Sequence, residues 1–135
     1  MTSTDPATVF QAYYESLVGG DMERLGGLLA DDIVWHQPGA GALSGIHRGR
    51  DAVLALFGEF MGRSHGTFRL VVREVMVNGP LVAATVDFTA DRPDRAPLGM
   101  SGVDLMRIEE DRITEVWLFS QDQAAEDLFW GLDQG

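Results

Sequence analysis

Residues 98–120 read LGMSGVDLMRIEEDRITEVWLFS, which is the pattern of two β-strands joined by a tight turn. Leu98 to Ile108 and Ile113 to Phe119 are rich in β-branched and aromatic side chains, and the polar segment between them is short enough for a hairpin. Since side chains alternate along a strand, Met106 and Val103 point to opposite faces, and both faces of this hairpin are apolar. Each face therefore needs a cover. Either the C-terminal segment or a second copy of the chain supplies the outer one, and we favour a homodimer.

A second hairpin and a short strand are predicted upstream. Phe68 to Val77 and Leu81 to Thr89 are strand-like runs, and Asn78–Pro80 between them has the composition of a turn. Ile33 to His36 is β-branched and aromatic, which predicts a strand. The glycine-rich stretch from Gln37 to Gly49 predicts a long loop.

The remaining segments have helical spacing of their apolar residues. Asp5–Pro6 is typical of an N-cap followed by proline at the first helical position. The expected helices are one ending at Gly19–Gly20, a second capped by Asp21 and closed by Ala30–Asp32, a third capped by Asp51 and broken by Gly62 to Gly66, and a C-terminal segment from Asp122 to Leu132. Helices first and antiparallel strands afterwards predict an α+β fold with the helices on one face of the sheet.

Composition excludes several kinds of chemistry. The chain has 135 residues, which suits a single domain spanning residues 1–135. It contains no cysteine, and all 10 of its basic residues are arginine, so thiol and lysine Schiff-base chemistry are excluded. A net charge of −11 argues against nucleic acid and anionic membrane surfaces as partners. Met1 to Pro6 lacks the pattern of a secretory signal, so we expect a cytoplasmic protein.

Asp104 is the most informative polar residue because it shares a strand face with Met106. A carboxyl group on an apolar face is costly unless it is paired or neutral, and burial would raise its pKa into the range of a general acid. Two other interpretations stay open. The side chain could lie on the solvent side, or it could pair with an arginine of a neighbouring strand.

Tyrosines and histidines supply the other candidates. Tyr13 and Tyr14 lie on the first expected helix, where a tyrosine is either core or a hydrogen-bond donor to an oxygen that gains charge. His36 lies where the first strand meets the long loop and could transfer protons near neutral pH. His47 and His65 lie in polar loops, and the spacing of the three histidines supports no metal site.

The order of the elements and several phrases resemble the nuclear transport factor two-like superfamily, in particular its SnoaL-like and ketosteroid-isomerase-like branch. The resemblance extends from about Val9 to Ser120. The phrases that carry it are Tyr13 to Asp21, Leu29 to Trp35, Gly45 to Val53, Val103 to Ile108 and Arg112 to Trp117. It implies a cone-shaped fold, in which a curved, mostly antiparallel sheet wraps over three N-terminal helices and encloses a pocket.

The same resemblance implies a set of catalytic residues. In ketosteroid isomerases a tyrosine and a protonated aspartic acid bind the developing oxyanion, and these fall on Tyr13 and Asp104. The family's base falls on Gln37, whose amide cannot abstract a proton. A longer loop after Gln37 could bring His36 into that space, although strict alternation would point His36 away from it.

The resemblance also implies what the pocket binds. It suggests a small, apolar, carbonyl-bearing ligand, no cofactor, and a homodimer through the outer sheet face at Trp117 and Phe119. Besides the catalytic candidates, the residues expected to line the pocket are Tyr14, Trp35, Gln37, Phe57, Phe60, Met61, Met106, Val116, Leu118 and Ser120.

Three functions are compatible with these residues. The first is a cofactor-independent isomerase or cyclase for polyketide- or steroid-like molecules, in which Asp104 is the acid and base and Tyr13 binds the enolate. The second is a ligand-binding or dimeric assembly module without catalysis, since one fold hosts many functions. The third is an epoxide hydrolase, which would need an arginine between two acids, such as Arg69 with Asp87 and Asp104.

Overall fold

A computed structural model describes residues 5–132 of the chain. The expected absence of a secretory signal was based on Met1 to Pro6, and most of that stretch lies outside the described range. The elements in chain order are α1 (Pro6–Gly19), α2 (Met22–Leu28), β1 (Leu29–Gln37), β2 (Gly45–Arg48), α3 (Arg50–Arg63), β3 (Arg69–Asn78), β4 (Leu81–Ala90), β5 (Leu98–Glu109), β6 (Arg112–Ser120) and α4 (Gln123–Trp130).

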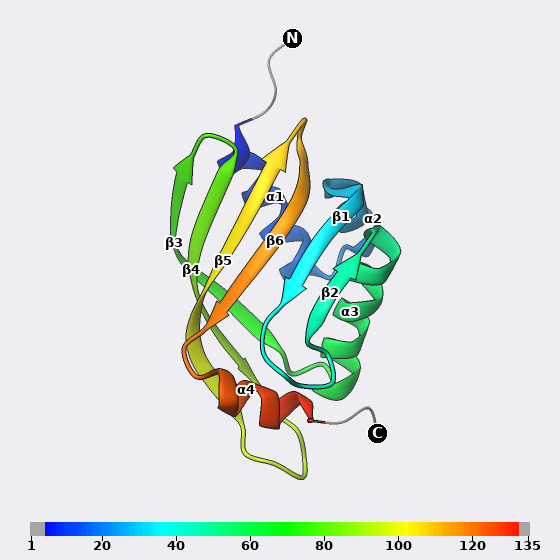
Figure 1. The fold of residues 1–135 in the computed structure, drawn as a ribbon, viewed down its shortest axis with the longest axis vertical. Coiled ribbons are helices and arrows are strands. Elements are labelled where there is room, and N and C mark those ends of the chain that lie inside the picture. Colours follow the sequence, from blue (N-terminus) through cyan, green and yellow to red (C-terminus); the bar gives the residue numbers. More distant parts are fainter. Residues whose placement is uncertain (1–4, 133–135) are drawn as a thin grey trace.

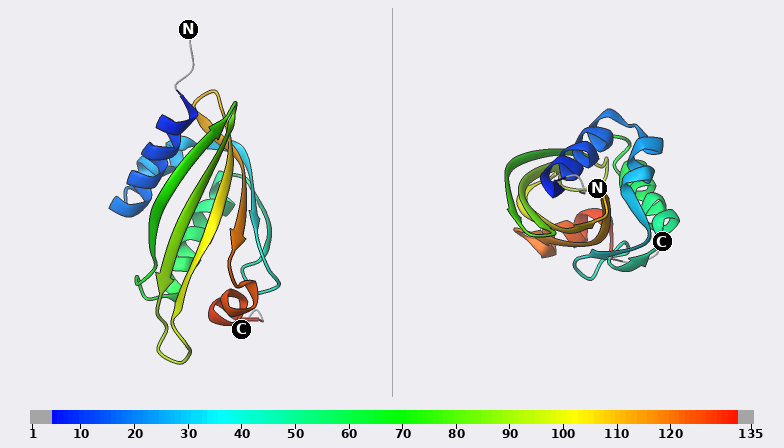
Figure 2. Two further views of the ribbon diagram at one scale, coloured as in Figure 1. Left: turned by 90° about the vertical axis from the view of Figure 1, so that its left-hand side faces the viewer. Right: turned by 90° about the horizontal axis from the view of Figure 1, so that it is seen from above.

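The strands form one curved, unclosed sheet of six strands in the order β2-β1-β6-β5-β4-β3. Both predicted hairpins are present, since β3 pairs with β4 and β5 pairs with β6 in antiparallel fashion. The exception to antiparallel pairing is β1, which runs parallel to β6. Helices α1, α2 and α3 lie on the concave side of the sheet, as Figures 1 and 2 show. The predicted α+β class, with a curved sheet over three N-terminal helices, is confirmed.

The helix starts agree with the predicted caps in two cases of three. The side chains of Asp5 and Asp21 accept hydrogen bonds from backbone N–H groups at the starts of α1 and α2. The prediction for Asp51 was wrong: α3 begins at Arg50 after Gly49, and no side chain caps it. Asp51 lies in the first turn instead, where a negative charge is favourable near the helix N-terminus.

The first strand is longer than predicted, and one strand was missed. Ala30–Asp32 does not close the second helix but belongs to β1, which begins directly after α2. The expected long loop contains β2, an edge strand that pairs with β1. Its residues Gly45–Arg48 have only one large apolar side chain, Ile46, which is exposed, so no alternating pattern marks the strand.

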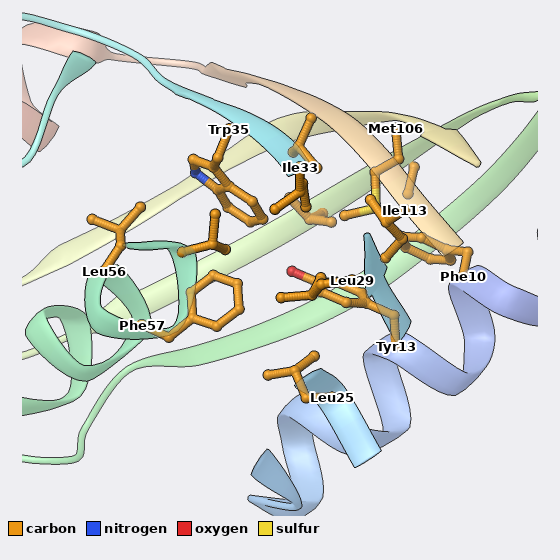
Figure 3. Packing of buried hydrophobic residues seen from close by; sticks show 14 of the residues in the cluster. Phe10, Tyr13, Leu25, Leu29, Ile33, Trp35, Leu56, Phe57, Met106 and Ile113 are labelled. Atoms are coloured by element: carbon orange, nitrogen blue, oxygen red, sulfur yellow. The ribbon is translucent and has the colours of Figure 1, made fainter. Parts of the chain in front are cut away.

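The core lies between the concave face of the sheet and the helices. Figure 3 shows side chains of α1 and α3, among them Phe10 and Phe57, packed against Ile33, Met106 and Ile113 of the strands. Tyr14 lies beside this core and ties α1 to β3: its hydroxyl donates to the carbonyl oxygen of Leu70 at 3.0 Å.

The C-terminal helix α4 lies at one end of the sheet and does not cover its convex face (Figure 1). The C-terminal segment, one of the two covers considered from sequence for the outer face of the sheet, therefore does not cover that face. Apolar side chains on the convex face are exposed, and Phe119 has an exposed fraction of 57%. No helix within residues 5–132 has the length and apolar character that a bilayer span requires.

Replacing Tyr14 should destabilise the fold. The hydroxyl donates to Leu70 and accepts from the backbone N–H of Val72 at 3.4 Å, so Tyr14→Phe removes both bonds and leaves two backbone groups unpaired. We expect a loss of roughly 1–2 kcal/mol in the free energy of unfolding, measured by urea denaturation. Tyr13→Phe, on the same helix, is the matched control and should cost less. Equal losses for the two variants would contradict this assignment.

Candidate active site

A cavity of about 880 Å³ lies between the concave face of the sheet and helices α1, α3 and α4. Nine of the residues proposed from sequence line it: Tyr13, Trp35, Gln37, Phe57, Phe60, Met61, Asp104, Leu118 and Ser120. Its volume falls in the range of small-molecule sites. Val18, Met22 and Met61 combine a place in the lining with high exposure, and they mark the mouth of the cavity.

Asp104 lies in the middle of β5, where its register partners are Ala84 of β4 and Leu118 of β6. All three side chains therefore point to the concave face, so Asp104 faces the cavity rather than open water. Burial, and then the negative charge of Glu126, raise the pKa of the Asp104 carboxyl to about 7. Both protonation states are accessible near neutral pH, which suits an acid or a base.

Tyr13 reaches into the same core from α1 and has an exposed fraction of 2% (Figure 3). Burial, and then the charge of Asp104, raise the pKa of its hydroxyl above the ordinary value. The hydroxyl therefore keeps its proton and acts as a donor. Within residues 5–132 no hydrogen bond joins it to Asp104, so the two groups border one cavity without forming a pair.

Trp35 and Gln37 form a fixed polar element at the end of β1. The indole N–H of Trp35 donates to Oε1 of Gln37 at 3.0 Å, and an edge-to-face contact with Phe57 holds the indole ring. Because an indole nitrogen can only donate, the carbonyl side of the Gln37 amide must face Trp35. The amide nitrogen has no partner among the described residues and lies on the lining, so its N–H groups can donate into the cavity.

Helix α4 supplies two cavity residues that the sequence analysis missed, Glu126 and Trp130. Their signal was the spacing of Glu126, Phe129 and Trp130, which places an acid on the buried face of the helix. Three arginines fix the C-terminal end of α4: Arg63, Arg92 and Arg95 donate to the backbone carbonyls of Leu128, Phe129 and Trp130.

Aromatic side chains form part of the cavity wall that also contains Asp104 and Glu126. Phe60, Phe68 and Trp130 contact one another with ring centroids 5.0–6.0 Å apart. Phe88 adjoins Phe68, and it also lies against Gly102, where a Cβ atom would contact its ring at 3.1 Å. Of these, only Phe60 was expected in the lining.

His36 does not join the site. Its Nε2 atom lies 2.7 Å from Oε2 of Glu115, and its ring stacks on Trp117 with centroids 5.5 Å apart. Trp35 and Gln37, its neighbours in β1, line the cavity, so His36 points to the convex face. The structure therefore places His36 outside the cavity, and the alternation of the strand explains why.

Three other expected lining residues are also outside the cavity wall. Tyr14 binds β3 through its hydroxyl, and Met106 and Val116 are fully buried in the core beneath the helices. The acids and arginine of an epoxide hydrolase do not assemble either. Asp87 pairs with Arg73 and accepts from Ser101, away from the cavity that Arg69 and Asp104 border.

The raised pKa of Asp104 should make stability depend on pH. The folded pKa of about 7 lies above the unfolded value of roughly 4, so the folded state binds the proton more tightly and stability falls as pH rises between these values. Asp104→Asn should remove this fall. Above pH 7 the free energy of unfolding of the variant should exceed that of the unmodified protein by about 2–4 kcal/mol.

Urea unfolding between pH 4 and 8 checks this expectation. Asp87→Asn is the control, because hydrogen bonds from Ser101 and Arg73 lower the pKa of that half-buried carboxyl, and its removal should leave the fall in place. If Asp104→Asn and the unmodified protein gave parallel curves, a buried acid at this position would be ruled out.

Comparison with known proteins gives a consistent result. The family model described as a SnoaL-like domain matches residues 10–116. A protein of unknown function with a cystatin-like fold from Xanthomonas campestris superposes with a TM-score of 0.90 at 39% identity, over 95% of this chain and 99% of that one. An uncharacterized protein of Mycobacterium tuberculosis is 28% identical, over 96% of this chain and 99% of its own.

A third comparison is with IdmH, a putative polyketide cyclase from Streptomyces antibioticus. It superposes with a TM-score of 0.74 at 22% identity, over 94% of this chain and 98% of that one, and so shares the fold. The family model covers most of the chain, including most of α1 and all of β1, α3 and the Asp104 strand. This chain therefore belongs to the SnoaL-like family.

Proposed function

We propose that this protein binds a small, largely apolar, carbonyl-bearing molecule of polyketide or steroid type and isomerises or cyclises it by acid–base chemistry, without a cofactor. The observation that carries the proposal is a single one: a carboxyl group with a pKa of about 7 lies on the wall of a mostly apolar cavity of about 880 Å³. The shared fold with a putative polyketide cyclase supports the substrate class.

In this proposal Asp104 moves the proton. Its carboxylate form takes a proton from the carbon next to the substrate carbonyl. The electron pair of the broken C–H bond forms a carbon–carbon double bond, and the π pair of the carbonyl moves onto the oxygen to give an enolate. In an isomerisation the proton returns to another carbon. In a cyclisation the enolate carbon forms a bond to a second carbonyl carbon, and Asp104 returns the proton to the alkoxide that results. A pKa of about 7 serves both transfers.

Tyr13 and Gln37 bind the oxygen that gains charge. Tyr13 is a buried donor that keeps its proton, and Trp35 directs the N–H groups of Gln37 toward the cavity. Donors fixed in advance stabilise an enolate without a cost of reorientation. Gln37 then replaces the base of the isomerase pattern with a donor, and this leaves Asp104 as the acid and base.

The experiment begins with a panel of small ketones and polyketide-like compounds, screened by thermal shift, because a ligand of the folded state raises the melting temperature. A compound that binds is then followed for conversion by mass spectrometry. Asp104→Asn should lower turnover roughly 10²–10⁴-fold, and Tyr13→Phe roughly 10²-fold, with smaller effects on KM. His36→Ala is the control and should keep full turnover. Unchanged turnover in Asp104→Asn would remove Asp104 from the mechanism.

A non-catalytic binding module is the second candidate. Two observations favour it: an amide, Gln37, stands where the family resemblance places a base, and Tyr13 and Asp104 share no hydrogen bond among the described residues. In that case a panel compound binds, and Asp104→Asn changes its affinity, but no product forms at any pH.

The proposal includes a homodimer through the convex face of the sheet. Supporting it, Val71, Met76 and Phe119 are 52%, 54% and 57% exposed there. An apolar patch of this kind commonly marks an interface. Phe119→Glu should convert a dimer to a monomer in sedimentation equilibrium, because a charge in an apolar interface is costly. Leu128→Glu on α4, at a side chain 62% exposed, is the control and should leave the mass unchanged. A monomeric unmodified protein would contradict this part of the proposal.

A further inference from the structure

Glu126 is a buried acid that the proposed chemistry does not use. It lies on α4 with an exposed fraction of 6%, and its side chain lines the same cavity as Asp104. An acid this well buried is unusual unless it is paired or hydrogen-bonded. Glu126 has no arginine partner within residues 5–132, so its carboxyl group is held by neutral groups alone.

Three donors surround that carboxyl group. The Ser120 hydroxyl donates to Oε1 at 2.6 Å and the Gln123 amide donates to the same oxygen at 3.1 Å. The indole N–H of Trp130 donates to Oε2 at 3.1 Å. Every partner donates and none accepts, which is the arrangement that suits a carboxylate.

The strand register brings this carboxylate close to Asp104. Gly102 pairs with Ser120 and Asp104 pairs with Leu118, so Ser120 and Asp104 are diagonal neighbours on the concave face. Ser120 holds Oε1 of Glu126 on that same face. The two acids thus lie at one end of the cavity, and the charge of Glu126 contributes to the raised pKa of Asp104.

Other charged groups of the cavity do not offset this effect. Among the described residues on the lining, the titratable side chains are Tyr13 from α1, Arg69 from β3, Asp104 from β5 and Glu126 from α4. Arg69 is exposed, and its guanidinium donates to the carbonyl oxygens of Gly66 and Phe68. Tyr13 stays neutral.

We propose that Glu126 is a positioning residue whose buried negative charge makes the Asp104 carboxylate a stronger proton acceptor, which makes α4 part of the working site. The inference rests on the proposed function, in which Asp104 is the acid and base. It also assigns a role to the three donors, Ser120, Gln123 and Trp130. They stabilise a charge away from water at the end of an apolar cavity, where its effect on Asp104 is large.

The test measures Asp104 directly and needs no substrate. Carbon-13 carboxyl NMR of the full chain should show Asp104 titrating near pH 7. Glu126→Gln keeps the shape and removes the charge, so we expect the pKa of Asp104 to fall by roughly half a unit to one unit. The value should stay above the ordinary one, because burial, the larger cause, remains.

Two matched variants separate charge from structure. Asp127→Asn removes one charge from the same helix at a residue outside the cavity lining, and it should leave the pKa of Asp104 unchanged. Glu126→Asp restores the charge and should keep the pKa of Asp104 raised. A folded Glu126→Gln variant with an unchanged Asp104 titration would overturn the inference.

A second measurement covers the case in which Glu126→Gln fails to fold. In the unmodified protein the titration curve of Asp104 should depart from that of an isolated acid, since interacting acids report each other's protonation. A curve that fits one isolated acid would overturn the inference without any variant.

The same experiment distinguishes failure of the inference from failure of the proposed function. If no compound is converted but Glu126→Gln still lowers the pKa of Asp104, the coupling stands and the catalytic proposal fails. If conversion depends on Asp104 but the titration of Asp104 is unchanged in Glu126→Gln, the catalytic proposal stands and the inference fails. With a turned-over substrate, Glu126→Gln should shift the pH–rate profile to lower pH by the same amount as the pKa of Asp104.

Discussion

The alternation of β5 is the constraint on which the site depends. Asp104 shares its face with Met106 and cannot leave the concave side without carrying that methionine out of the core. The fold therefore forces a carboxyl group into an apolar environment, and the neutral form of the acid is the least costly response. The same strand sends Val103 and Leu105 to the convex face, so the acid and the exposed apolar surface are two results of one register.

The curvature of the sheet places this half-buried acid on the wall of a cavity. Gly102 has no Cβ, which would collide with the carbonyl oxygen of Phe119, so the glycine permits β5 and β6 to approach at this point. The absent side chain also leaves space that the ring of Phe88 occupies. The helices then keep the cavity open on the other side, with Tyr14 tying α1 to β3 and three arginines fixing the end of α4.

Much of the fold could be predicted because its signals are local. Asp5 and Asp21 act within a few residues, and both hairpins have short polar turns between apolar runs. Strand β2 could not be predicted, since its pairing with β1 depends on a partner across a loop and not on its own pattern. Asp51 was predicted as the cap of α3 because aspartate is a good capping residue. It lies two positions after Gly49, the residue that occupies the N-cap position.

The residues of the site were likewise predictable where the signal is local, and were missed where it depends on a distant partner. Asp104 and Gln37 could be placed on the concave face by alternation, and the same rule correctly pointed His36 away from the cavity. Tyr13 and Tyr14 are adjacent on a helix, and only the tertiary contact with Leu70 shows which of them serves the fold. Glu126 was missed because an acid on a short helix is usually solvated, and the donors that bury it come partly from another element.

The two ends of the cavity differ in how firmly they are built, and this has a consequence for ligand choice. The end at α4 is clamped by guanidinium groups, whereas Met22 and Met61 at the mouth are flexible side chains that repack readily. In the proposed function, tolerance for variation in the ligand should thus increase with distance from the carbonyl group that Asp104 and Tyr13 bind: strict at the carbonyl, permissive at the tail.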